Sequence, residues 1–224
     1  GVGGSGKQSL ARLASFICGY DVFQISVTSS YGVNEFKEDL MKLYQRAGLK
    51  GHPVAFLMTD GQIVKEEFLV YLNDLLSSGY IPDLFSPEDK DNVCNSVRSE
   101  VKQAGVIDSA ENCWDFFIEK VRKYLHVVLC FSPVGDKFRV RARNFPALIN
   151  GTVIDWFHAW PHEALVSVAG RFLEDVTGMS DDVRENMQYH MAFAHTSVNE
   201  MSESYIQTCL LYTSPSPRDR AISR

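Results

Sequence analysis

The chain alternates segments with a helical and a strand-like spacing of hydrophobic residues, from its start to about residue 160. Apolar residues recur every three or four positions in the segments for which we predict helices: 7–18, 34–49, 65–76, 87–103 and 110–124. Short apolar or alternating runs predict strands over 21–27, 54–59, 126–131 and 153–157. Strands that alternate with helices are typical of a parallel α/β sheet with helices on both faces, which is the fold class that we expect.

The rest of the chain has a different character. Helical spacing dominates from Glu163 onward, and the last 16 residues lose this periodicity abruptly. The terminal Ser/Pro/Arg-rich segment closely resembles the translation of a common sequencing adapter; a natural linker or a basic interaction tail is the alternative. We therefore expect an α/β domain over 1–160, a helical part over 161–207, and a non-native, disordered tail over 208–224.

Composition excludes several classes of function. Hydrophobic residues make up 45% and charged residues 22% of the chain, which is the balance of a globular protein with a sizeable core. The net charge of -6 argues against a nucleic-acid partner. No apolar run approaches the roughly 20 residues that span a bilayer, so we expect no membrane segment. The cysteines lack the C-x-x-C spacing of a zinc site.

The chain begins with a glycine-rich sequence that fits the pattern G-x-x-x-x-G-K, directly before the first predicted helix. In such loops backbone N–H groups face phosphate oxygens, the helix N-terminus adds positive dipole, and the lysine contacts the β and γ phosphates. The pattern normally ends in Ser or Thr, whose hydroxyl binds Mg²⁺. Gln8 stands there instead, followed by Ser9. The candidate nucleotide-binding residues are Gly1, Val2, Gly3, Gly4, Ser5, Gly6, Lys7, Gln8 and Ser9.

A second candidate element lies about 50 residues later, where the predicted strand 54–59 ends in Thr59 and Asp60. A Walker B strand ends in Asp, which binds Mg²⁺, and then Glu, which orients the attacking water. Here one carboxylate is missing and the other is shorter. Asp60 is thus the candidate catalytic residue, and Ser9 and Asp60 are the candidate metal ligands; alternatively, Asp60 merely caps the next helix.

Several segments carry distinctive motifs: GVGGSGKQSL at 1–10, FLMTD at 56–60, LLSSG at 75–79 with LF at 84–85, LCFSPVG at 129–135, FPALIN at 145–150, IDWF at 154–157, WP at 160–161, EAL at 163–165 and SVNEMS at 197–202. Together these segments resemble the fourth AAA+ module of axonemal dynein heavy chains. The similarity covers residues 1 to about 207 in order, and residues 113–122 resemble the β-like outer-arm chains.

The resemblance implies a P-loop NTPase fold of the AAA+ type: a large subdomain with a five-stranded parallel sheet, followed by a helical lid that leads toward the stalk. In that plan the first strand precedes the phosphate loop and lies mid-sheet. This chain begins after it, so we expect that strand to be missing, with a gap beside 54–59 and 126–131. A sensor residue falls on Ser132, where active modules often carry Asn.

An arginine finger, which reaches the nucleotide of the preceding module, would follow Asn150 in this family. Gly151 stands there, so we expect no finger. The nearby Arg139, Arg141 and Arg143 are interpreted as a solvated surface segment.

The function implied is that of an ATP/ADP- and Mg²⁺-binding regulatory module with weak or no hydrolysis. A working ATPase module, with Asp60 replacing Glu and with Ser9 or water helping to hold Mg²⁺, is one alternative, and a nucleotide-free structural ring segment is another. The implied partners are the neighbouring AAA+ modules, the microtubule through the parent's stalk, and dynein intermediate and light chains through its tail. The implied location is the cytoplasm and cytoskeleton, in the axoneme of cilia or flagella.

Overall fold

The computed structural model describes residues 4–133 and 136–213, with side chains up to residue 208. The chain divides into two compact units, residues 1–158 and 159–224, which are treated separately below. In the described part no helix is both long enough and apolar enough to cross a membrane.

The first unit is built on a parallel sheet in the order β1-β2-β3, formed by Asp21–Phe23, Val54–Thr59 and Leu125–Cys130. The central strand β2 is buried along five of its six residues, as expected for an uninterrupted apolar run between two neighbouring strands. Its pairing with β3 runs from Val54 opposite Leu125 to Thr59 opposite Cys130. The predicted α/β fold class is confirmed.

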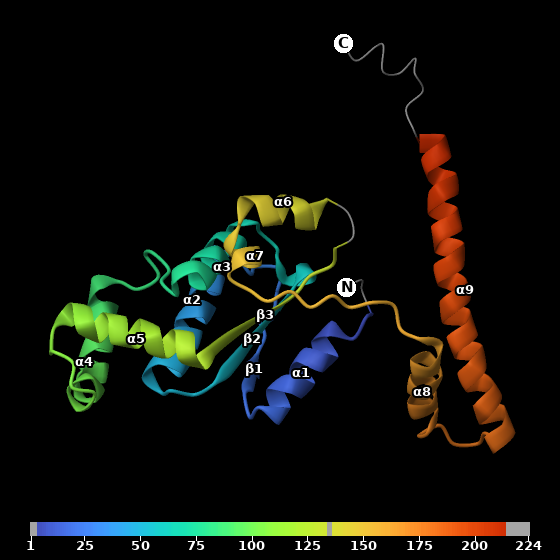
Figure 1. Ribbon diagram of the computed structural model, residues 1–224, viewed down its shortest axis with the longest axis horizontal. Helices are drawn as coiled ribbons and strands as arrows, with labels where there is room; N and C mark the ends of the chain where they lie inside the picture. The colour runs from blue at the N-terminus through green and yellow to red at the C-terminus, as the bar shows by residue number, and fades with distance from the viewer. Residues whose placement is uncertain (1–3, 134–135, 214–224) are drawn as a thin grey trace, which may run out of the picture. The chain divides into compact units, whose positions relative to one another are not determined.

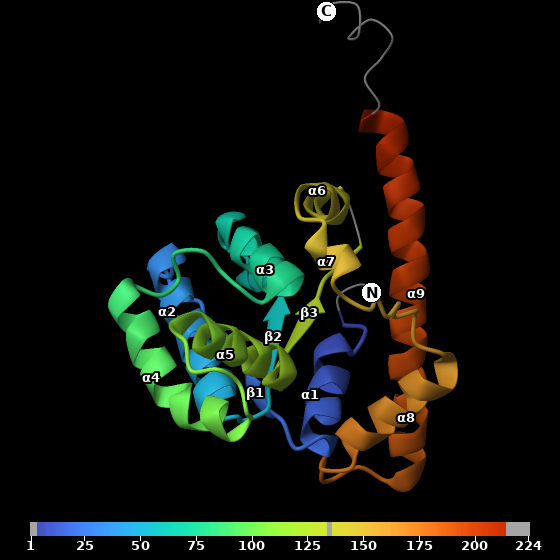
Figure 2. The ribbon, with the colours of Figure 1, turned by 60° about the vertical axis from the view of Figure 1, so that its left-hand side comes forward.

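Helices cover both faces of this sheet. Figures 1 and 2 place α1 on one side and α2, α4 and α5 on the other. Bulky aromatic side chains, among them Phe36, Tyr44, Phe68 and Phe117, form the centre of the core between these helices and β2. The elements of this unit besides the strands are α1 (Lys7–Ile17), α2 (Val33–Tyr44), the π-helical turn η1 (Gln45–Leu49), the 3-10 turn η2 (Asp60–Gln62), α3 (Glu67–Ser78), α4 (Pro87–Gln103), α5 (Ala110–Tyr124), α6 (Lys137–Asn144) and α7 (Ala147–Asn150).

Two of the predicted strands require correction. The strand expected over 21–27 ends at Phe23, because the Gln62 amide donates a hydrogen bond to the carbonyl of Ile25 at 2.6 Å and takes the place of a neighbouring strand. The segment 153–157 is not a strand. A strand requires a hydrogen-bonding neighbour, and none of the described strands pairs with this segment.

A groove with a cavity volume of about 750 Å³ runs along β3. Its lining comes from α1, from β3 and from the segment 151–157. Among the described strands β3 pairs only with β2, whereas β2 pairs on both sides. The gap expected from the sequence therefore lies beside β3 and not beside β2.

The second unit contains α8 (His162–Leu173) and α9 (Asp181–Thr213), which pack against each other. Arg184 of α9 fastens the turn between them by donating hydrogen bonds to the carbonyls of Leu173, Glu174 and Val176. The expected disordered segment over 208–224 is wrong for residues 208–213, which continue α9. Residues 214–224 lie outside the described residues.

Candidate functional site

The described part of the glycine-rich loop has the backbone that phosphate binding requires. Gly4 and Gly6 adopt positive φ angles of 73° and 82°, and α1 begins at Lys7 immediately after Gly6. Non-glycine residues rarely adopt this left-handed conformation, so both glycines are needed for the chain to turn into the helix. The predicted phosphate-loop residues Gly1, Val2 and Gly3 lie outside the described residues.

The side chains of the loop differ in exposure. Ser5 is buried, and Lys7 Nζ donates a hydrogen bond to Ser5 Oγ at 3.2 Å. Gln8 and Ser9, on the first turn of α1, are exposed. The ammonium of Lys7 is thus held over the loop, where the sequence predicts that it contacts phosphates.

The loop lies close to the carboxyl end of β3. Cys130, the last residue of β3, has its thiol pKa raised mainly by burial, while Lys7 acts to lower that pKa and Asp60 acts to raise it. Both charges are therefore near enough to act on the same thiol. The structure brings the phosphate loop and the predicted catalytic carboxylate to one end of the sheet, as in other α/β folds that bind ligands beyond the carboxyl ends of their strands.

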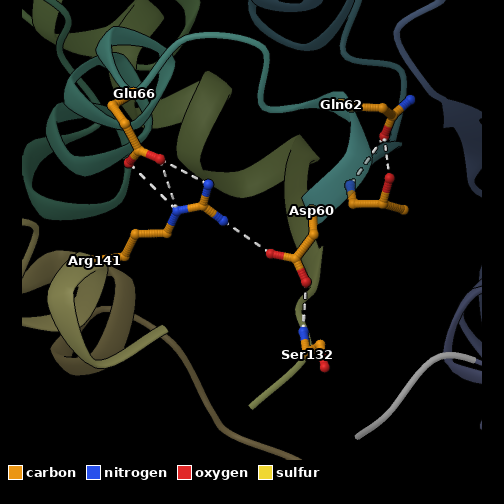
Figure 3. A network of polar contacts seen from close by, with 6 residues as sticks. Asp60, Gln62, Glu66, Ser132 and Arg141 are labelled. Carbon is orange, nitrogen blue, oxygen red and sulfur yellow. Dashed lines mark hydrogen bonds and ion pairs between the residues drawn. The ribbon is translucent and has the colours of Figure 1, made fainter. Parts of the chain in front are cut away.

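Asp60 begins η2, the 3-10 turn directly after β2. Its Oδ2 accepts a hydrogen bond of 2.6 Å from the backbone N–H of Ser132, which follows β3. Asp60 and the predicted sensor residue Ser132 are thus in direct contact, because β2 and β3 are neighbours and end side by side (Figure 3).

The other oxygen of Asp60 is bound by a buried arginine. Arg141 Nη1 donates to Asp60 Oδ1 at 2.9 Å, and the guanidinium also lies 6.0 Å from the ring centre of Phe131. The Arg141 side chain is only 9% exposed. The interpretation of Arg141 as a solvated surface residue is therefore wrong, although Arg139 and Arg143 are exposed as expected.

Glu66, the N-cap residue of α3, binds the far side of the same guanidinium. Arg141 Nη2 donates to Glu66 Oε1 at 2.8 Å, and Nε lies 3.2 and 3.3 Å from the two Glu66 oxygens. Figure 3 shows the arginine side chain between the two carboxylates.

Glu66 had no predicted role and Arg141 was predicted at the surface, although the spacing of the three arginines indicates that Arg141 is buried. On a helix, residues two positions apart point to nearly opposite sides, whereas residues four apart share a face. If Arg139 and Arg143 face solvent, Arg141 must point inward.

Thr59 is hydrogen-bonded within the turn that follows β2. It stands at the position where a Walker B strand carries its Mg²⁺-binding Asp. Gln62 Oε1 accepts hydrogen bonds from the Thr59 N–H at 2.9 Å and from the Thr59 hydroxyl at 3.1 Å. The Thr59 side chain is thereby used to hold the turn after β2.

The geometry of the loop suits a phosphate group, and the carboxylate proposed for Mg²⁺ has protein partners. The left-handed glycines and Lys7 at the start of α1 are a suitable cradle for an anion. Mg²⁺ in nucleotide sites is usually held by one or two carboxylates besides the phosphates. Asp60, the candidate carboxylate, accepts hydrogen bonds from the Ser132 N–H on one oxygen and from Arg141 on the other.

The position expected for an arginine finger is closed to large side chains. A Cβ atom on Gly151 would lie 2.8 Å from the carbonyl oxygen of Ala147 and 3.0 Å from that of Leu76. Both atoms belong to the backbone, so an arginine here would displace α7 from α3.

Comparison with known proteins identifies the family. The family described as "P-loop containing dynein motor region D4" matches residues 1–217, a range that includes part of the segment 208–224. The "Dynein beta chain, flagellar outer arm" of Chlamydomonas reinhardtii is 68% identical over 97% of this chain, and the "Dynein alpha chain, flagellar outer arm" of the same alga is 51% identical. "Dynein axonemal heavy chain 17" of Homo sapiens is 53% identical over 97% of the chain.

The chain spans about 5% of the length of these relatives. The higher identity to the algal β chain than to its α chain supports the resemblance to β-like outer-arm chains. With the glycine loop, the parallel sheet and the family match in agreement, the chain belongs to the dynein heavy-chain family as an AAA+ P-loop module of motor region D4.

Proposed function

We propose that this module binds ATP or ADP as a regulatory site of an axonemal dynein motor and hydrolyses ATP weakly or not at all. The observation that carries the proposal is the contrast between two parts of one site. The phosphate loop keeps its glycine backbone and Lys7, while Asp60 is held between Arg141 and the Ser132 N–H.

The loop geometry supports nucleotide binding. Its left-handed glycines direct the chain into the N-terminus of α1, where the positive end of the helix dipole favours an anion. Lys7 supplies a cation at the same place.

Three features support weak hydrolysis. Thr59 provides no carboxylate and is bound by Gln62, Asp60 is one methylene shorter than the usual Glu, and Asp60 is held by other protein groups. General-base or water-orienting groups must lie within hydrogen-bond reach of the reacting water, and a misplacement of about 1 Å can cost on the order of 100-fold in rate. Ser132 at the sensor position and the closely packed Gly151 fit the same interpretation.

The biological role that we propose follows from the names of the relatives, which are axonemal, ciliary or flagellar dynein chains. The whole heavy chain would move along microtubules in the axoneme. Within it, this module would contact neighbouring AAA+ modules, while the stalk would bind the microtubule and the tail would bind intermediate and light chains.

Lys7→Ala in the heavy chain that contains this module tests the binding. Hydrogen bonds to charged groups contribute about 1.5–3 kcal/mol, so affinity for a fluorescent ATP analogue at this loop should fall roughly 10- to 150-fold. The other phosphate loops carry inactivating substitutions in this experiment. Lys50→Ala, at an exposed lysine in the turn before β2, is the matched control and should leave affinity unchanged. Equal affinity in Lys7→Ala and wild type would remove the basis for calling this a nucleotide site.

The weak hydrolysis has its own test. Thr59→Asp combined with Asp60→Glu restores both Walker B carboxylates and should raise the single-turnover hydrolysis rate at this module. A double variant no faster than wild type would mean that the missing carboxylate is not what limits the reaction.

A further inference from the structure

We propose that Arg141 is a positioning residue that sets the activity of this site by fixing the orientation of the Asp60 carboxylate and occupying one of its lone pairs, and that Glu66 is the alternative partner to which Arg141 can be released. This inference rests on the proposed function, because it concerns the same nucleotide site. It assigns a role to two residues, Arg141 and Glu66, that lie outside the phosphate loop and the Walker B position.

The first step of the argument is that both oxygens of Asp60 are engaged. Oδ1 accepts from Arg141 Nη1 at 2.9 Å, and Oδ2 accepts from the Ser132 N–H at 2.6 Å (Figure 3). A carboxylate that orients an attacking water or binds a metal must offer it an oxygen lone pair in the right direction. The guanidinium of Arg141 lies on the oxygen that is not needed by the backbone of Ser132, so it competes directly with water or metal.

The second step is that Arg141 does not depend on Asp60 to stay buried. Nη2 and Nε form a two-point contact with Glu66, and the ring of Phe131 lies against the guanidinium. Only Nη1 reaches Asp60. Loss of that one contact leaves the charge of Arg141 paired, which avoids the large penalty of an unpaired buried charge.

The third step is that a cavity beside Asp60 gives water room to replace Arg141 at the carboxylate. A cavity of about 260 Å³ is lined by Asp60, Ile63, Ser132, Lys137 and Arg141. A water molecule takes about 30 Å³ in the liquid, so the cavity has room for several waters beside the carboxylate. The Asp60 side chain is 40% exposed and that of Glu66 62% exposed, so either carboxylate can be solvated when the arginine leaves it.

These features define two arrangements of the site. In the arrangement of this structure Arg141 bridges both carboxylates and Asp60 is held. In the other, Arg141 binds Glu66 alone, and the Asp60 carboxylate can turn and offer water the lone pair of Oδ1 that Arg141 occupied. Any change that moves α6 relative to α3 by a small amount would shift the balance between them, since Arg141 lies on α6 and Glu66 caps α3.

The test uses the heavy chain with the other phosphate loops inactivated, and measures both single-turnover hydrolysis and the affinity for a fluorescent ATP analogue. Arg141→Met keeps a long apolar side chain at this buried position and removes the donors, so the hydrolysis rate should rise on the order of tenfold at unchanged nucleotide affinity. Glu66→Gln takes away the alternative partner and should lower the rate. Arg139→Gln, on the exposed face of the same helix, is the control and should change neither quantity.

A double-variant cycle separates positioning from general damage. Because Glu66 acts only through Arg141, Arg141→Met with Glu66→Gln should hydrolyse as fast as Arg141→Met alone. A rate that is unchanged or lower in Arg141→Met at wild-type affinity would overturn the inference, as would a fall in both single variants. If Arg141→Met does not fold, an unchanged or faster Glu66→Gln still overturns it, and a slower one supports it. Loss of nucleotide binding would be seen separately in the affinity measurement, so failure of the proposed function is distinguishable.

Discussion

The edge of β3 that no described strand pairs with leads to a prediction about the stability of the chain on its own. Extension at Gly1 by about ten residues of apolar heavy-chain sequence should place a strand in the groove beside β3. The loop after such a strand would begin near the carboxyl end of β3, where Lys7 acts on Cys130. A strand that ends there runs parallel to β3, as the described strands run parallel to one another.

The magnitude follows from the geometry of the sheet. β2 and β3 pair over six residues, and a new neighbour of the same length would form about six hydrogen bonds of about 0.5–1.5 kcal/mol each, or about 3–9 kcal/mol. It would also cover apolar side chains that line the groove from α1 and from the segment 153–157; Leu10 is 53% exposed and Val153 is 92% exposed in this structure. Domains have total stabilities of only about 5–15 kcal/mol, so such a strand decides whether the domain folds cooperatively.

Urea unfolding followed by circular dichroism, with light scattering for association, checks this. The chain of 224 residues should self-associate and unfold over a broad range, since open strand edges and exposed apolar groups promote pairing between chains. The extended chain should be monomeric with one sharp transition. The control is an extension that carries two prolines, which cannot complete the hydrogen-bonded ladder. This extension should not restore the monomeric state or the sharp transition. A sharp transition from monomeric, unextended chain would refute the reasoning.

Two further predictions concern packing and thiol reactivity. Gly48→Ala in the extended chain should lower the free energy of unfolding, measured by urea titration, by about 1–3 kcal/mol, because the added Cβ would lie 2.3 Å from a ring carbon of Phe117. Gly61→Ala is the control and should be nearly neutral, because the space around Gly61 is open. Equal effects of the two variants would contradict the packing of η1 on α5. Iodoacetamide near neutral pH should alkylate the exposed Cys18 before Cys94 and Cys130, whose thiol pKa values burial raises, as peptide mass mapping would show; early labelling of Cys130 would contradict its burial at the end of β3.

Local sequence patterns correctly predicted the helices and strands that are determined by their own residues and caps. The helices over 87–103 and 110–124 are confirmed, because helical periodicity coincides there with serine N-caps at Ser86 and Ser109. The strand 54–59 is likewise confirmed, since an uninterrupted apolar run is typical of a central parallel strand.

Elements that depend on distant partners were not predictable in this way. Residues 153–157 are apolar enough for a strand, but no described strand pairs with them. The truncation of β1 depends on Gln62, a residue almost 40 positions away, whose amide binds the Ile25 carbonyl. The same holds for the site: the glycine loop and Asp60 could be found from sequence, whereas the pairing of Arg141 with Glu66 and Asp60 joins residues 75 and 81 positions apart.

The most direct test of the regulatory role is the identity of the nucleotide that this module retains. The heavy chain, with its other phosphate loops inactivated, would be incubated with ATP, separated from free nucleotide and denatured, and the released nucleotide identified by chromatography. A Lys7→Ala version measures the background. We predict about one nucleotide per chain, mostly ATP after many minutes, and none in the Lys7→Ala version. Rapid conversion to ADP would contradict weak hydrolysis, and an empty site in the unmodified loop would contradict nucleotide binding altogether.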